Sequence, residues 1–353
     1  MASPPKVVLD PQDSLVLKGA GILAIAFHNY FHFLSHAEHN EYDFSRSRVV
    51  ALLAALRDYR QIVAALFSFF GHFGVQIFIF LSAYGLALSY WDRKMSWATF
   101  MLGRARKIYP LFLAAIAIWL LLLGPIDGPM GPLLLLRDHA GDLVLTLLGV
   151  AALVPGHQLP PIGPWWFIPF IMESYAIWPV LRAITMRFGA RGLFALSVAG
   201  VTLSTLIIYA HVNLFFSPLG HLPELCLGIA AARYGYFPGK WAALAGIVVL
   251  VLGNVFWFLW PLTFTGALCM MIAGYPHVRR AMRESAFLRR AGTISMALFL
   301  VNGFIRKLFI ALAENGSWSS GIFLGVCAVG TAWILAEILT RLFSGSRASA
   351  PAA

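Results

Sequence analysis

Charged side chains are scarce in this chain. They make up 12% of its 353 residues, whereas an average soluble protein contains about 25%. Hydrophobic residues make up 60%, and apolar stretches of about 20 residues, the length that crosses a bilayer, recur from end to end. No polar segment is long enough to build a separate soluble core. The composition therefore excludes a soluble enzyme. It predicts an all-α, polytopic membrane protein, because a helix satisfies its own backbone within lipid.

Cysteine is equally scarce, and its placement excludes a disulfide framework. The three residues, Cys226, Cys269 and Cys327, lie far apart in apolar segments, as small buried hydrophobic side chains do. The N-terminus lacks the basic start and small-residue cleavage site of a signal peptide, so the first apolar run is expected to be a retained helix. The net charge of +11 comes without an aromatic and basic platform outside the membrane. No nucleic-acid partner is therefore expected, and the charge indicates basic cytoplasmic loops.

About ten transmembrane helices are predicted from the apolar runs. The segment 133–155 is apolar too, but Arg137, Asp138, His139 and Asp142 crowd one end of it. We therefore predict an interfacial or re-entrant helix there. The predicted spans are 14–34, 66–90, 108–124, 164–182, 192–210, 219–233, 241–258, 260–276, 292–312 and 319–340.

The distribution of basic residues predicts that both termini are cytoplasmic. If 133–155 crossed the membrane, every later basic cluster would face outward. Residues 1–343 are expected to form one transmembrane domain, followed by a short flexible tail at 344–353. We find no internal repeat. In the predicted orientation all but seven of the 26 basic residues face inward, and the seven are Arg46, Arg48, Arg57, Arg60, Arg137, Arg306 and Lys307.

His28 is the most informative residue of the first span. It lies ten residues after Lys18, which places it ~15 Å deeper along a helix, near the middle of a ~30 Å hydrocarbon core. An ionisable group at that depth marks a candidate functional site, and histidine suits proton transfer near neutral pH. Two other interpretations stay open. One is a metal site with His32 and His36 on the same helix face, although no third ligand is evident; the other is a buried, hydrogen-bonded histidine.

Other polar residues also call for an explanation. The basic residues Arg104, Arg106 and Lys107 stand at the predicted cytoplasmic mouth of a helix, where they bind a polyanion or simply set the topology. A carboxylate inside a span, Glu173, is an acid–base candidate or the partner of a buried base. The loop HAEHNEYDFSRSR after the first span is either solvated or forms an extracytoplasmic pocket around Glu41 and Asp43.

Six short segments, in order along nearly the whole chain, resemble the acyltransferase 3 family of integral membrane acyltransferases. The first is a basic residue, a glycine and, ten residues after the basic residue, a histidine: Lys18, Gly19 and His28. The others are Phe80 to Tyr84; Arg104, Lys107, Ile108 and Pro110; Trp166, Phe167, Glu173, Tyr175 and Pro179; Pro223, Leu225 and Gly228; and Gly292, Ile294 and Ser295.

The chain departs from the family pattern at three places. Lys107 stands where the family has arginine, which keeps the charge but loses the planar fork. Ala83 and Tyr84 replace glycine and phenylalanine, so that turn packs differently. Asn302 occupies a position where the late helix often carries a histidine. The core histidine and the first arginine are retained, so we expect an active enzyme without the soluble hydrolase-like domain that some members carry.

The resemblance implies an acyl-CoA donor, usually acetyl-CoA, that enters from the cytoplasm. It also implies a carbohydrate or lipid-linked glycan hydroxyl as acceptor. The basic side chains Lys18, Arg104, Arg106 and Lys107 are expected to bind the phosphates of coenzyme A. His28 is expected to act as general base on the acceptor hydroxyl, or to accept the acyl group itself. No permanently bound cofactor and no metal are expected.

Further residues receive supporting roles in this scheme. Asn29, Ser82 and Tyr84 are expected to orient the imidazole or stabilise an oxyanion, and Glu173 is the second catalytic candidate. Glu41 and Trp166 are expected to contact the acceptor. The bilayer of a bacterial inner membrane is the expected location. The alternatives are a proton-coupled transporter that uses buried His and Glu residues, and a structural membrane subunit.

Overall fold

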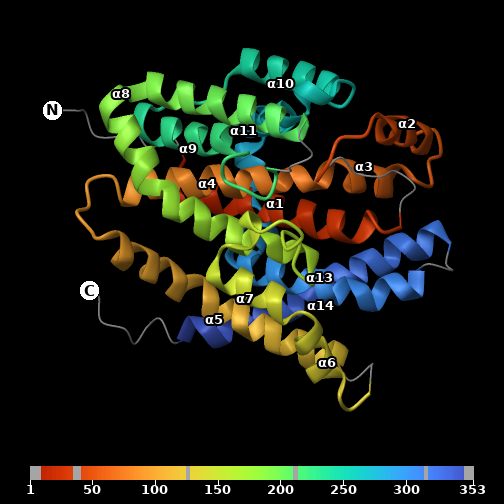
Figure 1. Cartoon of the computed structure of the whole chain (residues 1–353). Helices are drawn as coiled ribbons and strands as arrows, with labels where there is room; N and C mark the ends of the chain where they lie inside the picture. The colour runs from red at the N-terminus through yellow and green to blue at the C-terminus, as the bar shows by residue number, and fades with distance from the viewer. Residues whose placement is uncertain (1–8, 35–40, 125–127, 210–213, 314–316, 346–353) are drawn as a thin grey trace.

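The computed structural model describes residues 9–34, 41–124, 128–209, 214–313 and 317–345. Helix accounts for 82% of the structure, and the described ranges contain no β-strand, so the all-helical prediction is confirmed (Figure 1). The helices are α1 Pro11–Phe31, α2 Arg46–Ala55, α3 Ile62–Phe70, α4 Gly74–Ser89, α5 Trp97–Leu123, α6 Gly131–Asp138, α7 Ala140–Leu148, α8 Phe167–Tyr209, α9 Leu222–Tyr234, α10 Lys240–Gly253, α11 Trp260–Glu284, α12 Ala286–Thr293, α13 Ser295–Ala313 and α14 Trp318–Gly345.

Every predicted span overlaps at least one helix, and the span 66–90 takes in both α3 and α4. Within the described residues, seven helical segments are long and apolar enough to cross a membrane. One of them, α8, contains two predicted spans, 164–182 and 192–210, and Gly189 breaks it between them with φ 63° and ψ −145°. The helices α9 and α10 have only 13 and 14 residues, short of the ~20 that a span needs. The count of ten spans and the cytoplasmic termini therefore stay predictions.

The ambiguous segment 133–155 forms no long helix. It contains most of α6 and all of α7, which have 8 and 9 residues and are separated at His139. Neither helix is long enough to cross a ~30 Å core by itself. The tail predicted at 344–353 lies almost entirely outside the described residues.

The first helix, α1, lies in the middle of the bundle (Figure 1) and packs on α3, α4, α12 and α13. Glycines make these contacts unusually close. A Cβ added at Gly74 of α4 would lie 2.5 Å from the carbonyl oxygen of Gly21, and one added at Gly292 of α12 would lie 1.9 Å from that of Leu15. Small residues allow such backbone approach between helices in a membrane. The two ends of the predicted site, Lys18 and His28, therefore lie on a helix that its neighbours pack against closely.

Ionic contacts fix the start of α1 to α11. The side chain of Asp10 caps α1. Asp13 is fully buried and accepts hydrogen bonds from the Tyr275 hydroxyl, at 2.6 Å, and from the Arg279 guanidinium, at 2.9 and 2.7 Å. Arg283 adds a 2.7 Å contact to Asp10. A buried carboxylate with this many donors is fully satisfied. It sets the axial position of α1 in the bundle.

The contact between α4 and α9 gives a test of the packing. A Cβ at Gly228 would lie 2.4 Å from the Phe80 carbonyl oxygen, so Gly228→Ala is expected to destabilise the protein by about 1–3 kcal/mol through overpacking. The measurement is thermal unfolding of the protein in detergent. Gly274→Ala in α11, where a Cβ meets nothing within 4 Å, is the control and should be neutral or slightly stabilising. Equal unfolding temperatures for the two variants would contradict this close packing.

Candidate active site

Four basic side chains surround a cavity of about 450 Å³ where α1, α4, α5 and α8 meet. We call it the cationic cavity. Its basic residues are Lys18, Arg93, Arg104 and Lys107, and no carboxylate among the described residues lines it. Because the protein itself does not neutralise these charges, the cavity attracts an anion.

The guanidinium of Arg104 is held in place by aromatic rings. Its central carbon lies 4.5 Å from the ring centre of Tyr90, 5.0 Å from that of Tyr175 and 5.2 Å from that of Phe100. Such cation–π contacts orient an arginine without neutralising its charge. Arg104 therefore keeps its capacity to bind an anion in the cavity.

The predicted basic cluster divides between two faces of α5. Arg104 and Lys107 are three residues apart, share a face of the helix and line the cationic cavity. Arg106 is exposed and does not line this cavity or the second cavity described in the next paragraph. Arg93, from the loop between α4 and α5, joins the cavity instead. Arg93 was not among the predicted site residues, because no local sequence pattern shows that this loop folds over the cationic cavity.

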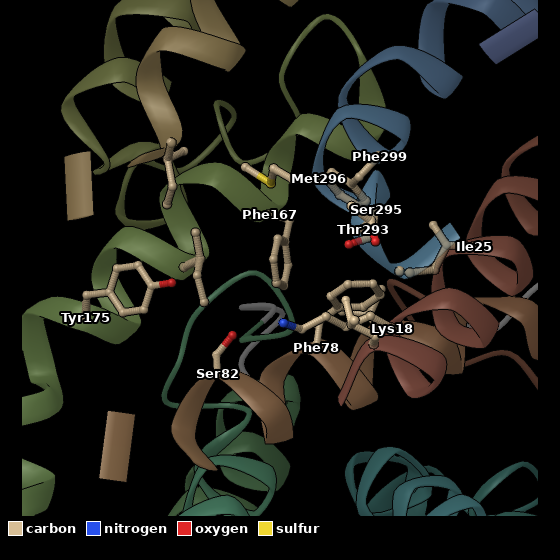
Figure 2. A pocket seen from close by; sticks show the side chains of 15 residues that line it. Lys18, Ile25, Phe78, Ser82, Phe167, Tyr175, Thr293, Ser295, Met296 and Phe299 are labelled. Atoms are coloured by element: carbon tan, nitrogen blue, oxygen red, sulfur yellow. The ribbon is translucent and has the colours of Figure 1, made fainter. Parts of the chain in front are cut away.

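A second cavity of about 410 Å³ continues from the first (Figure 2). We call it the apolar cavity. The two cavities share Lys18, Ser82 and Tyr175, and Figure 2 shows the Lys18 amine and the Ser82 and Tyr175 hydroxyls directed into this region. Farther in, the walls are largely apolar, with Ile25, Val75, Phe78, Phe167, Ile171, Met296 and Phe299. Lys18 and Ser82 thus lie at the junction between the cationic cavity and the apolar cavity.

The apolar cavity ends close to His28. Ile25 lines it and precedes His28 by three residues on α1, a rise of ~4.5 Å. Val75 lines it from α4 and lies three residues after His72, whose ring centre is 5.4 Å from that of His28. His28 itself is in the last turn of α1, which ends three residues earlier than predicted. It is nevertheless 1% exposed.

His28 is held at both ring nitrogens. Its Nδ1 lies 2.9 Å from the carbonyl oxygen of Ser68 and 3.2 Å from that of Phe67, and its Nε2 lies 3.0 Å from Oε2 of Glu41. Since carbonyl oxygens only accept, Nδ1 carries a proton. A second proton then lies between Nε2 and the Glu41 carboxylate, either as imidazolium with carboxylate or as imidazole with carboxylic acid. The buried pair therefore stores one exchangeable proton.

Aromatic side chains cover the Glu41 end of this pair. The Tyr42 ring stacks on Phe216 at 5.2 Å and meets Phe215 edge-on at 5.4 Å. Burial, together with the Glu41 charge and hydrogen bond, raises the pKa of the Tyr42 phenol well above its usual value, so the hydroxyl stays protonated. Trp166 packs under Phe215 at 4.8 Å and is 2% exposed. It has no free face in this conformation.

Three polar residues of α1 and α13 lie beside the pair. The Asn29 amide donates to Oδ1 of Asn302 at 2.7 Å, and Arg306 donates to the Asn29 carbonyl at 2.5 Å. The Arg306 guanidinium is 7% exposed and interacts electrostatically with Glu41 and Tyr42. Arg306 was predicted only as one of the seven basic residues that do not face inward. Its position within the apolar run FLVNGFIRK was the available signal for a buried role.

Two predicted site residues lie away from both cavities. The Tyr84 hydroxyl donates to the Leu9 carbonyl and accepts from the Leu9 amide, both at 3.0 Å, so it ties down the chain before α1. Glu173 lies on α8 two residues from Ile171 and Tyr175, which line cavities, and so faces roughly the opposite side of the helix. Its Oε1 is buried and makes no hydrogen bond within the described residues. The structure therefore does not group Tyr84 or Glu173 with His28.

The described residues offer no geometry for the metal alternative, because they contain no group of three or more potential ligands. The imidazole of His32 bonds through Nδ1 to the His28 carbonyl oxygen at 2.9 Å. His36 lies outside the described residues.

Comparison with known families identifies the domain. The profile of the acyltransferase 3 family, described as an acyltransferase domain, matches residues 15–337. The matched range includes both cavities and the buried His28–Glu41 pair. Searches of curated proteins and of solved structures each gave no match.

The split of the basic cluster leads to a test with a matched control. Arg104→Gln is expected to weaken binding of coenzyme A at least tenfold, because a charge-assisted contact to phosphate is lost. Arg106→Gln, the same change two residues away on the outer face, should bind like wild type. The measurement is isothermal titration of coenzyme A into the detergent-solubilised protein. Equal losses in both variants would show that only bulk charge matters.

Proposed function

Because the chain belongs to the acyltransferase 3 family, we propose that it is an integral membrane O-acyltransferase. It moves an acyl group, most simply acetyl, from cytoplasmic acyl-CoA to a hydroxyl of a cell-surface or exported carbohydrate, in a bacterial inner membrane. One observation carries the proposal. A cationic cavity continues into an apolar cavity that ends one helical turn from a buried His–Glu pair.

The two cavities suit the two chemical parts of an acyl-CoA. The diphosphate binds in the cationic cavity against Arg104, Lys107 and Arg93, where charge-assisted hydrogen bonds are strongest. The less polar pantetheine arm lies in the apolar cavity. Lys18 and Ser82 stand at the junction, where they can contact the amides of the arm. This path brings the thioester toward His28.

The transfer needs one proton acceptor, and Nε2 of His28 has that role. When the acceptor enters between Nε2 and Glu41, the proton that these two groups share leaves to solvent. The neutral Nε2 then takes the proton of the acceptor hydroxyl as the oxygen attacks the thioester carbonyl. The C–S bond then breaks, the new C–O ester bond remains, and the proton passes from Nε2 to the leaving thiolate of coenzyme A. The carbonyl oxygens of Ser68 and Phe67 fix the ring throughout, because both hold Nδ1–H.

Glu41 meets the acceptor in this scheme. Without acceptor it occupies Nε2 directly, so the acceptor must come between the two side chains. A sugar with two neighbouring hydroxyls can donate one hydrogen bond to Nε2 and another to the Glu41 carboxylate. These two hydrogen bonds replace the direct contact between His28 and Glu41. Arg306 provides a nearby positive charge. That charge favours the carboxylate form of Glu41 and an oxyanion in the transition state.

The first test is acyl transfer by wild type beside His28→Gln. The purified protein is mixed with acetyl-CoA and extracted cell-surface glycan, and coenzyme A release is measured. The variant should lose at least ~100-fold in rate, the lower end of general-base catalysis. His32→Gln, one turn along the same helix, should keep its activity, because the His32 Nδ1 bonds to a backbone carbonyl oxygen. Full activity in His28→Gln would reject the mechanism. No release and no acetyl-CoA binding by wild type would favour the proton-coupled transporter.

The second test removes the charge of Glu41. In Glu41→Gln the amide can donate to Nε2 and block it, so acyl transfer should fall ~100-fold or more while acetyl-CoA binding is kept. Asp43→Asn is the control in the same loop, since Asp43 is exposed and pairs with Arg48 at 2.6 Å. Steady-state rates over a range of acceptor concentrations measure the effect. Wild-type rates in Glu41→Gln would exclude Glu41 from the acceptor site.

A further inference from the structure

A third, smaller cavity adjoins the cationic cavity and shares no lining residue with the apolar cavity. We call it the aromatic cavity. Its volume is about 130 Å³, and it shares Tyr90 and Arg93 with the cationic cavity. The remaining lining residues are Met95, Trp97, Phe100, Trp178, Pro179 and Arg182, and no carboxylate among the described residues is one of them.

The size and the walls of this cavity suit a flat aromatic ring. A cavity of roughly 150 Å³ holds a benzene molecule, so 130 Å³ with one open side admits a flat base that remains partly exposed. Four aromatic side chains, Tyr90, Trp97, Phe100 and Trp178, contribute to the lining. Stacking of a nucleobase on an aromatic side chain contributes about 1–3 kcal/mol.

Arg182 adds an anion-binding group to the same cavity. Its Nε donates to the Trp91 carbonyl oxygen at 2.5 Å, which anchors the guanidinium. Its two terminal nitrogens make no hydrogen bond or ion pair within the described residues. Arg93, over the Tyr90 ring at 5.2 Å, lies between this cavity and the cationic one. The cavity thus combines aromatic faces with an arginine whose fork is available to a phosphate.

The order of the three cavities matches the order of groups in one ligand. Aromatic walls with an arginine come first, then a set of unpaired cations, then an apolar channel. An acyl-CoA has an adenine with a 3′-phosphate, then a diphosphate, then pantetheine and the thioester. We propose that the aromatic cavity binds the 3′-phosphoadenosine end of the donor, with the base against Trp97 and Trp178 and the 3′-phosphate on Arg182. This inference rests on the proposed function.

The assignment predicts which kind of acyl donor the enzyme prefers. An acyl group carried on a protein-bound phosphopantetheine has no adenosine, so it leaves the aromatic cavity empty and forgoes both the stacking and the 3′-phosphate contact. The enzyme therefore selects free acyl-CoA over an acyl carrier protein. Simple anchoring of tryptophans at the membrane surface predicts no such preference.

Binding of three probes tests the assignment. Coenzyme A, 3′-dephospho-coenzyme A and 4′-phosphopantetheine are titrated calorimetrically into the detergent-solubilised full chain. Wild type should bind them in that order of affinity. Arg182→Gln should reduce the preference for coenzyme A over its dephospho form by about tenfold to a hundredfold, the range for a charged hydrogen bond. Trp97→Leu should weaken both nucleotides about equally and leave phosphopantetheine binding close to wild type.

Matched controls separate the local effect from overall charge and folding. Lys94→Gln removes the basic residue next to Arg93, and Arg187→Gln removes one farther along α8. Neither residue lines any of the three cavities described above. Both variants should keep the wild-type preference. Arg182→Lys keeps the positive charge without the planar fork, so it should retain part of the preference. This variant replaces Arg182→Gln in the test if Arg182→Gln folds poorly.

The outcomes are distinguishable from failure of the proposed function. If wild type binds no coenzyme A, the donor itself is wrong and the inference falls with it. If wild type binds coenzyme A, but Arg182→Gln keeps the wild-type preference for the 3′-phosphate and Trp97→Leu keeps the wild-type affinity for both nucleotides, the nucleotide lies elsewhere. That result would overturn the inference and leave the acyltransferase assignment in place.

Discussion

The close packing of α1 is the constraint on which the rest of the site depends. Its neighbours approach so closely that a Cβ at Gly19, Gly71 or Gly74 would lie within 2.6 Å of a backbone oxygen. Its start is fixed by Asp13, which is buried among donors from α11. A helix held this way cannot shift along its axis without breaking several contacts at once. The contacts of α1 therefore fix the separation between Lys18 in the cationic cavity and the buried His28.

The charges of the bundle fall into two groups with different consequences. Cations that hold the structure together have carboxylate partners, as Arg279 has in Asp13 and Arg290 has in Glu337. Cations that line the cationic cavity have none among the described residues. Leaving several positive charges unpaired in one place opposes folding through their mutual repulsion. An anionic ligand that binds there would offset this repulsion. Ligand binding therefore explains why several cations lie together in a protein that has few charged residues.

The fold was largely predictable from hydropathy, because lipid leaves few alternatives to helices. The predicted spans overlap helices, and seven helical segments of the described residues are long enough to cross a membrane. The break of α8 at Gly189 and the shortness of α9 and α10 depend on how the helices pack. Local signals placed candidate residues on their elements, as Lys18 and His28 share one helix. The prediction kept Arg104, Arg106 and Lys107 in one cluster, although a spacing of three residues puts Arg104 and Lys107 on one face of a helix and Arg106 on another. The structure does not group Glu173 and Tyr84 with His28, because burial alone does not say what a polar side chain faces.

The sequence by itself determined that this is a helical membrane protein of the acyltransferase 3 family with an ionisable residue, His28, in its first apolar helix. Composition and short motifs carry that information because hydropathy and helical periodicity act over a few residues. Only the tertiary structure decided that Glu41 returns to Nε2 of His28, that Arg306 lies beside them, and that Tyr84 holds Leu9 instead of a substrate. These partners are joined by loop paths and helix contacts that no local pattern encodes, since each contact depends on the packing of the whole bundle.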